Sequence, residues 1–254
     1  MEEKGIINNL GPKTAFKAGL VTGLVGVIVI GFFVLLGMML GGKLPAKNTG
    51  NIAANNNAPA ANPTNPTAPT APTNTVINIK PVDKNNDWIR GDKNAKISIV
   101  EFSDIDCPFC VRFHPTMQQV MANYGGKVNW VWRHFPLTTL HPEAFKKAVA
   151  AECVGELGGE GKFWAFLDED MSNKKPLAQI NDTITKIGVD VNKFTECLNS
   201  TKYDQRVNDQ SQDAQAAGAR GTPYSVILSG NTKAPINGAL PYETIKAQLD
   251  ALLK

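Results

Sequence analysis

The sequence predicts an α/β fold with a small central sheet, preceded by a membrane-spanning segment and a linker. Three observations lead to this prediction: an apolar stretch without charges near the N-terminus, a proline-rich stretch after it, and β-branched runs alternating with helical periodicity from about residue 81 onward. The predicted elements come in the order strand–helix–strand, then a long helical region, then strand–strand–helix. This order is typical of helices packed on a sheet. The chain has 254 residues, enough for a sizeable core.

The first element is the stretch 18–42, AGLVTGLVGVIVIGFFVLLGMMLGG, which contains no charged residue. A helix needs about 20 apolar residues to cross a bilayer core, so this segment is long enough. The alternative is a cleaved signal peptide, whose apolar core would be only about 7–15 residues long. We therefore expect an uncleaved transmembrane anchor, with residues 1–17 cytoplasmic and the C-terminal part outside the membrane. The lysines before the span favour this orientation only slightly.

Residues 43–80 are expected to form a disordered linker. The core of this stretch reads NNNAPAANPTNPTAPTAPTNT, without charges and almost without large apolar side chains. Such a composition cannot build a packed core, and its prolines favour an extended, semi-rigid spacer. The folded domain is then expected to span 81–254.

The formal net charge of +3 lies entirely in the first fifty residues, which hold five lysines and two glutamates. The remainder is neutral by formal count. Nucleic-acid-binding domains normally carry a basic face, so we expect no nucleic-acid partner.

The folded domain begins with a buried strand and a helix. KISIVEF, residues 96–102, is rich in β-branched side chains and predicts the strand. Asp106, Cys107 and Pro108 are typical of a helix start, because proline is tolerated in the first turn. Apolar or small residues then keep helical spacing up to Gly125.

The rest of the domain is predicted as a second strand, a helical insert and a closing unit. KVNWVWRHF at 127–135 alternates in the manner of a strand, and the region of about 140–217 indicates several helices. YSVIL at 224–228 predicts another strand. NTKAPINGAL predicts a turn with a short strand, and YETIKAQLDALLK an amphipathic closing helix.

Cys107 and Cys110 stand where the first strand meets the first helix, in SDIDCPFCVRFHP. A zinc site normally needs four ligands, and no second CxxC accompanies this one. Haem attachment would require histidine at Val111. An inert buried pair is a further alternative. The redox interpretation is favoured because a helix N-terminus stabilises a thiolate, the attacking species in disulfide exchange. Cys107 would then attack, and Cys110 would resolve the mixed disulfide.

Two further residues support a redox site. Glu101 lies inside the apolar strand, where a desolvated carboxyl could exchange protons with a buried thiol. The alternative is a glutamate on an edge strand that faces water. Pro223 precedes the YSVIL strand, and a cis bond there would make a tight bend, although a trans proline is commoner.

Five segments together resemble the DsbA-like thiol–disulfide oxidoreductases of the thioredoxin superfamily: EFSDIDCPFCVRFHP, RHFPL, HPEAFKKAVAAEC, GKFWAFLDED and GTPYSVIL. They occur in order between about residues 88 and 254. The resemblance implies a thioredoxin fold with an inserted helical domain. From the cysteine pattern we expect neither a metal nor a cofactor.

The resemblance also implies roles for individual residues. Glu101 matches the buried acid of the family, Cys107 its nucleophile and Cys110 its resolving cysteine. Pro223 matches the cis-proline that faces the active site. Thr222 matches the position whose backbone pairs with the substrate.

Phe109 marks a departure from the family, because the strongest oxidases carry Pro-His between the cysteines and this chain carries Pro-Phe. Phenylalanine offers a thiolate neither an N–H nor a positive charge. We therefore expect Cys107 to be less acidic than in those enzymes, and Phe109, with Thr222, to tune redox poise and partner choice.

Cys153 and Cys197 both lie in the predicted insert. An even number of cysteines outside the cytoplasm favours a disulfide, and two buried free thiols are the alternative.

These expectations combine into an extracytoplasmic, membrane-anchored thiol–disulfide oxidoreductase that introduces disulfides into exported proteins. A quinone-linked membrane partner is expected to reoxidise it. The alternatives are a disulfide reductase or isomerase, and a tethered protein-binding module without turnover.

Overall fold

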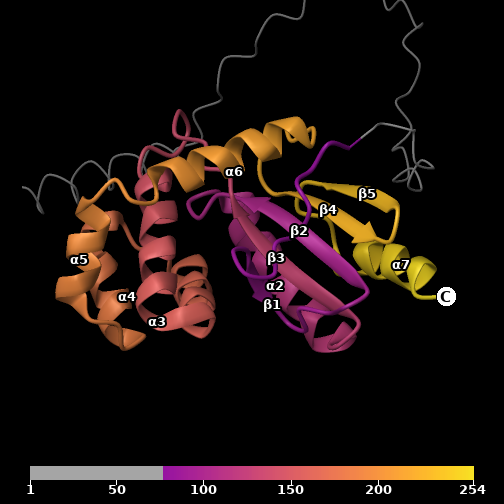
Figure 1. Ribbon diagram of the computed structural model, residues 1–254, viewed down its shortest axis with the longest axis horizontal. Helices are drawn as coiled ribbons and strands as arrows, with labels where there is room; N and C mark the ends of the chain where they lie inside the picture. Colours follow the sequence, from indigo (N-terminus) through magenta and orange to yellow (C-terminus); the bar gives the residue numbers. More distant parts are fainter. Residues whose placement is uncertain (1–76) are drawn as a thin grey trace, which may run out of the picture. The chain divides into compact units, whose positions relative to one another are not determined.

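Five strands form one mixed sheet in the order β1-β3-β2-β4-β5 (Figure 1). The computed structural model describes residues 77–254. The strands are β1 (Trp88–Arg90), β2 (Ile97–Ser103), β3 (Val128–His134), β4 (Tyr224–Ser229) and β5 (Thr232–Asn237). β2 pairs in parallel with β3 and antiparallel with β4. β2 and β3 are buried almost throughout, which explains their nearly continuous apolar sequences.

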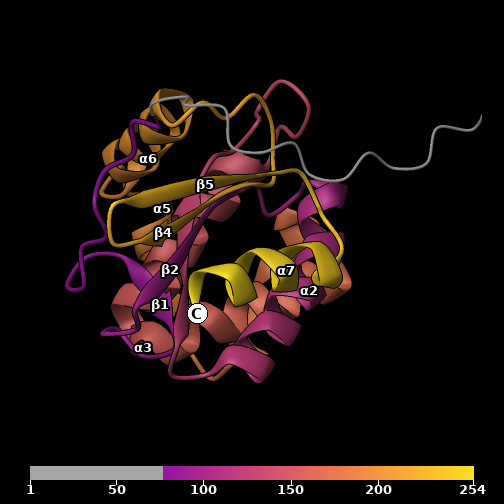
Figure 2. The same cartoon turned by 90° about the vertical axis from the view of Figure 1, so that its right-hand side faces the viewer.

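Helices cover both faces of this sheet. The helices are α2 (Pro108–Tyr124), α3 (Ala144–Asn173), α4 (Ile180–Lys186), α5 (Val191–Asn199), α6 (Asp204–Ala216) and α7 (Tyr242–Leu252), with a short 3₁₀ turn at Leu177–Gln179. Figure 2 shows α2 and α7 together on one side of the sheet. Side chains of α2, α3 and α7 share one apolar core with Trp130 and Trp132, whereas α6 contributes to a second core on the opposite face, with Val131.

Helix α3 bends where its glycines lie. Gly159 has a φ of 76°, a left-handed value that favours glycine and interrupts the helix. A side chain at Gly155 would meet the indole of Trp88 at 2.3 Å, so this glycine permits Trp88 to lie against the helix. Trp88 then stacks on Phe163 with 4.5 Å between ring centroids. These contacts attach the helical insert to the sheet edge at β1.

The thioredoxin-like α/β fold expected from the sequence is confirmed, with strands and helices close to their predicted places. The three-residue strand β1 was not predicted, since so short a segment shows no clear alternation. The predicted linker overlaps residues 77–80, where the structure buries Ile77 and Ile79. The proposed cytoplasmic segment 1–17, the anchor 18–42 and the linker up to residue 76 lie outside the described residues. Between residues 77 and 254, no helix has the length and apolarity needed to cross a bilayer.

A buried arginine fastens residues 77–87, here called the strap, to the sheet. The Arg133 guanidinium on β3 pairs with Asp87 at 2.7 Å and with Asp213 on α6 at 2.6 Å. It also donates to the carbonyl oxygens of Lys80 and Pro81, at 2.9 and 3.0 Å. Each of the three charged side chains is more than nine-tenths buried, so all of them depend on one another for compensation.

Replacing Arg133 by methionine is therefore expected to lower the free energy of unfolding by about 3–5 kcal/mol, because two buried carboxylates lose their cation. Urea denaturation followed by tryptophan fluorescence measures this loss. Lys202→Ala is the matched control, because it removes an exposed ion pair with Glu156 and should cost less than about 1 kcal/mol. Equal losses in the two variants would contradict the importance assigned to Arg133.

Candidate active site

The two cysteines of CPFC lie at the start of α2. Cys107 occupies the N-cap position, and Pro108 begins the helix. Both cysteines are free thiols. Cys107 is 3% exposed, and Cys110 is completely buried. The helix therefore presents the N–H groups of its first turn to the sulfur of Cys107, as the sequence predicted.

These surroundings make the two thiols very different acids. The pKa of Cys107 is lowered to about 5, first by a hydrogen bond from the Cys110 side chain and further by Thr222 and the backbone N–H groups of Cys110 and Phe109, against the opposing effect of burial. Burial, followed by the interaction with Cys107, raises the pKa of Cys110 well above its ordinary value. Cys107 is thus set up to be the thiolate and Cys110 to remain a protonated donor.

The segment just before β4 lies next to Cys107. The Thr222–Pro223 peptide bond is cis. The Cys107 thiol donates to the Thr222 carbonyl oxygen across 3.4 Å, although the two residues are 115 positions apart. The Thr222 carbonyl therefore lies beside the Cys107 sulfur, and the bond to Pro223 is cis, as the resemblance implied.

Glu101 is buried on β2 behind the cysteines, so the alternative of a water-facing edge glutamate is wrong for this residue. Its side chain is 1% exposed, and desolvation raises its pKa to about 7 although Ser103 and Trp130 act in the opposite direction. The charge of Glu101 also contributes to the high pKa of Cys110. A carboxyl that titrates near neutrality beside the Cys110 thiol is suited to accept or supply a proton.

The turn between β2 and α2 is fixed by a residue that the sequence did not single out. One oxygen of the Asp104 carboxylate accepts 2.8 Å hydrogen bonds from the Leu137 amide and from His141, and the other accepts from the Asp106 amide, also at 2.8 Å. The Cys107 amide donates to the Asp104 carbonyl oxygen at 3.1 Å. Asp104 thus holds the turn that carries Cys107. The two aspartates just before the CxxC motif were the available signal in the sequence.

A family model described as Thioredoxin matches residues 83–251. The chain belongs to the thioredoxin family.

Solved structures of thioredoxin-like fold agree with this membership. The thiol-disulfide exchange protein alpha-DsbA2 from Wolbachia pipientis superimposes with a TM-score of 0.57 at 24% identity, covering 65% of this chain and 86% of that one. Pseudomonas aeruginosa DsbA2 gives a TM-score of 0.56 at 23% identity, covering 65% and 93%. At these identities the similarity establishes the fold.

Curated relatives of this thioredoxin-family chain include much longer proteins. It is 30% identical over 173 residues to a protein named Na(+)/H(+) antiporter NhaA 1 from Mycolicibacterium gilvum, over 66% of this chain and 28% of that protein. The namesake from Mycolicibacterium vanbaalenii is 31% identical, with the same coverage. The chain therefore spans less than a third of the curated relatives it matches.

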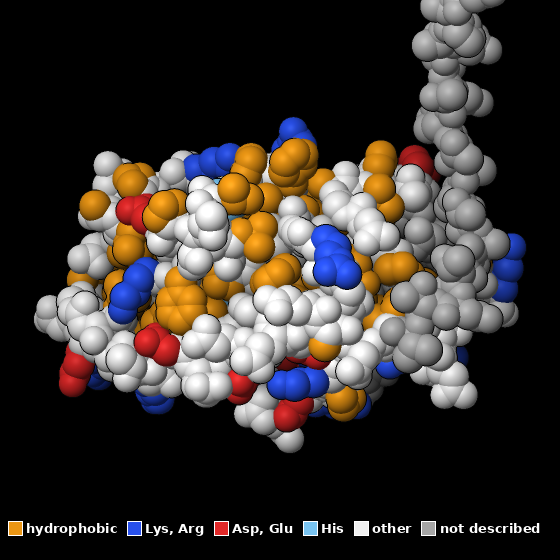
Figure 3. Space-filling view, turned by 90° about the horizontal axis from the view of Figure 1, so that it is seen from above, with side chains coloured by type: hydrophobic (Ala, Val, Ile, Leu, Met, Phe, Trp, Pro, Cys, Tyr) orange, Lys and Arg blue, Asp and Glu red, His pale blue; other side chains and the backbone are white. Residues whose placement is uncertain are grey.

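The surface of this thioredoxin-family domain carries exposed apolar side chains as well as the buried thiols. Phe109, between the two cysteines, is 53% exposed, and Leu140, in the loop after β3, is 70% exposed. The guanidinium of Arg112 lies 4.6 Å from the centre of the Phe109 ring. Figure 3 shows the face of the molecule seen from above, on which hydrophobic side chains occur in several groups between polar ones.

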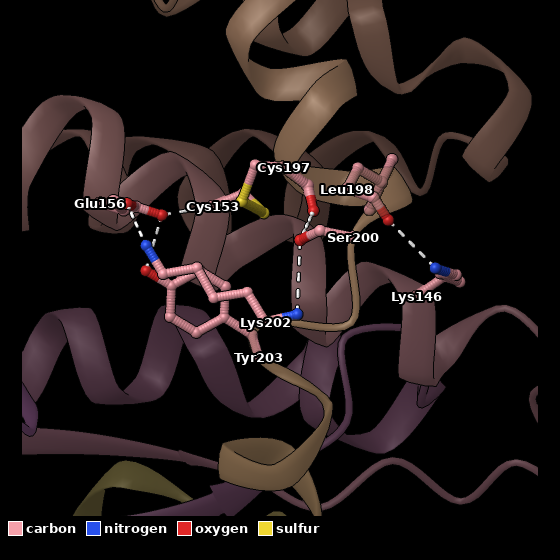
Figure 4. Close-up of a disulfide and its surroundings, with 8 residues drawn as sticks. All are labelled: Lys146, Cys153, Glu156, Cys197, Leu198, Ser200, Lys202 and Tyr203. Atoms are coloured by element: carbon pink, nitrogen blue, oxygen red, sulfur yellow. Dashed lines mark hydrogen bonds and ion pairs between the residues drawn. A yellow bond between two sulfur atoms is a disulfide. The ribbon is translucent and has the colours of Figure 1, made fainter.

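The structure joins Cys153 and Cys197 in a disulfide between α3 and α5 (Figure 4). Beside it, Glu156 pairs with Lys202 and accepts a 2.8 Å hydrogen bond from Tyr203. Both cysteines of this disulfide lie within the helical insert, and no hydrogen bond joins either of them to Cys107. Sequence reasoning had left two free thiols open as the alternative.

All three histidines of the chain lie in polar contacts. His114 meets Asp168 at 2.7 Å, His134 meets Glu152 at 3.3 Å, and His141 meets Asp104. Within residues 77–254, no three potential metal-ligating side chains are grouped together.

The thiolate of Cys107 in the reduced protein should titrate with a midpoint near pH 5, visible as ultraviolet thiolate absorbance. Iodoacetamide should label Cys107 and leave Cys110 unlabelled, which peptide mapping checks. Cys110→Ala should raise the midpoint because it removes the largest stabilising hydrogen bond, whereas Cys110→Ser keeps a donor. A midpoint above 8 in the unaltered protein would exclude this account of the site.

Glu101→Gln should stabilise the reduced protein at alkaline pH. The pKa of Glu101 rises on folding from an ordinary 4.5 to about 7, so its contribution to stability is complete below pH 4.5 and is lost as pH rises through 7. Glutamine avoids this loss. The free energy of unfolding of the variant should therefore exceed that of the unaltered protein by up to about 3 kcal/mol at pH 8. Denaturation at pH 5 and pH 8 measures the difference. The exposed Glu196→Gln should show no such pH dependence; an equal change there would refute the assignment.

Proposed function

We propose that this chain is a thiol–disulfide oxidoreductase that exchanges electrons through Cys107 and Cys110. The observation that carries the proposal is the position of Cys107 at the start of α2, where a hydrogen bond from Cys110 lowers the pKa of its thiol to about 5, with the Thr222 carbonyl oxygen 3.4 Å from its sulfur. A low-pKa thiol at a helix N-terminus provides the reactive sulfur. An adjacent backbone carbonyl offers an acceptor for a substrate strand.

In the oxidising direction, the site starts as a Cys107–Cys110 disulfide. A substrate thiolate attacks the Cys107 sulfur, a mixed disulfide forms, and Cys110 leaves with the electron pair and takes up a proton. A second substrate thiolate then attacks the substrate sulfur of the mixed disulfide, and Cys107 leaves as a thiolate. The substrate loses two electrons and two thiol protons, and the protein gains two electrons. Glu101 lies where it can relay the proton of Cys110.

Oxidation is the favoured direction because the site stabilises its reduced form. A Cys107 pKa of about 5 means that the thiolate is the dominant form at neutral pH, and a better leaving group makes the disulfide easier to reduce. The value stays above the roughly 3.5 of the strong oxidase DsbA. Phe109 fits this intermediate acidity, because its ring donates no hydrogen bond to the sulfur.

We further propose that the domain works outside the cytoplasm, held at the membrane by residues 18–42 and a linker. Its substrates would be exported proteins with paired thiols. Reoxidation requires an electron acceptor, and a quinone-linked membrane protein is the partner class that such an anchor would make accessible. No nucleic acid, metal or cofactor takes part in this scheme.

Oxidative refolding of a reduced two-cysteine protein and reduction of insulin together test the function. The oxidised protein should oxidise one substrate pair per molecule, and Cys107→Ser should abolish this. Equilibration with glutathione should give a reduction potential nearer −120 than −270 mV. A potential near −270 mV with rapid insulin reduction would favour a reductase. A reducible CxxC without either activity would favour a binding module.

A further inference from the structure

A buried lysine on the helical insert reaches the turn that carries the nucleophile. Lys147 lies in the first turns of α3, and its side chain is only 2% exposed. Its ammonium donates to Asp106 at 2.6 Å, to the Lys175 carbonyl oxygen at 2.6 Å and to Asp170 at 3.3 Å. These three acceptors satisfy all three N–H groups of the ammonium. A lysine buried this completely is rare unless it is paired.

One of these acceptors stands directly before the reacting cysteine. Asp106 immediately precedes Cys107, and its side chain is 22% exposed. Its backbone amide is held by the Asp104 carboxylate at 2.8 Å. Asp106 is thus held through its main chain by the β2–α2 turn and through its side chain by Lys147 on α3.

The charges around the turn make Lys147 electrostatically important for the thiolate. Asp104 and Asp106 lie on the turn itself, Glu101 lies behind it on β2, and Asp170 faces Lys147 within α3. Each carboxylate disfavours a second negative charge on a neighbouring sulfur. His141 faces Asp104 across 2.8 Å. The buried ammonium of Lys147 supplies a positive charge to Asp106, the acid nearest to Cys107 in sequence.

We propose that Lys147 is a positioning residue for Cys107: its buried ammonium holds Asp106 in place and neutralises it beside the nucleophile. The helical insert thereby contributes to the reactivity of a thiol carried by the thioredoxin-like part. The inference rests on the proposed exchange function of Cys107 and Cys110. It assigns Lys147 no contact with substrate.

A purely structural ion pair would behave differently from a positioning residue. Losing a structural pair lowers stability and leaves the titration of Cys107 unchanged. Losing the neutralising charge raises the pH midpoint of the Cys107 thiolate, because Asp106 then repels it. Removing Asp106 instead leaves the ammonium uncompensated on that side and lowers the midpoint. The opposite signs of the two effects identify the electrostatic role.

The test uses the full chain in detergent with three variants: Lys147→Met, Asp106→Asn and the two combined. Lys147→Met should raise the midpoint by about one pH unit and Asp106→Asn should lower it, while the double variant should return toward the unaltered protein. A one-unit rise makes the disulfide about tenfold harder to reduce by glutathione, which corresponds to about 30 mV. Lys146→Met is the matched control, since this neighbouring exposed lysine bonds the Leu198 carbonyl oxygen (Figure 4) and should change neither quantity.

Each outcome decides between the alternatives. Unchanged midpoints in Lys147→Met and Asp106→Asn, in a protein that exchanges disulfides normally, overturn the inference and leave the proposed function standing. A protein without exchange activity in its unaltered form removes the proposed function, and the titration of Cys107 still tests the charge effect. If Lys147→Met does not fold, Asp106→Asn decides alone, and a midpoint that does not fall refutes the role of Lys147.

Discussion

The antiparallel pairing of β2 with β4 is the constraint on which the site depends. This register sets Phe102 opposite Tyr224, so the end of β2 lies beside the beginning of β4. The turn after β2 leads to Cys107, and the segment before β4 ends in Thr222 and Pro223. Strand pairing thus brings together two pieces of chain that are 115 residues apart. The Cys107 sulfur lies there 3.4 Å from the Thr222 carbonyl oxygen.

Buried charge is the recurring cost in this fold, and the buried side chains differ in how that charge is compensated. Arg133 is compensated by Asp87 and Asp213, and Lys147 by Asp106 and Asp170. Glu101 has no such ion pair within residues 77–254: its side chain is 1% exposed, and desolvation raises its pKa to about 7. Compensated charges in this domain hold segments together, whereas the uncompensated carboxyl lies behind the thiols. The buried ion pairs therefore have a structural role, whereas the buried carboxyl with a raised pKa is suited to proton transfer.

Sequence patterns predicted those parts of the fold that local physics determines. β2 and β3 follow from their β-branched, apolar runs, and α2 from Pro108 after a capping position. The polar contacts of Asp104, Arg133 and Lys147 could not be predicted this way, because a single polar residue has no periodicity and its partner lies far along the chain. The cis bond at Pro223 was likewise beyond composition and spacing, and the family resemblance supplied it.

The strap also has a mechanical consequence. Ile77 and Ile79 are buried against the sheet face that α6 covers, and the Lys233 side chain holds the Ile77 carbonyl oxygen at 2.9 Å. A force applied at Ile77 would therefore be carried by β5 and, through Arg133, by β3, which lies between β1 and β2 in the sheet. The first described residues are thus attached to two different strands of the sheet, and neither attachment involves Cys107 or Thr222.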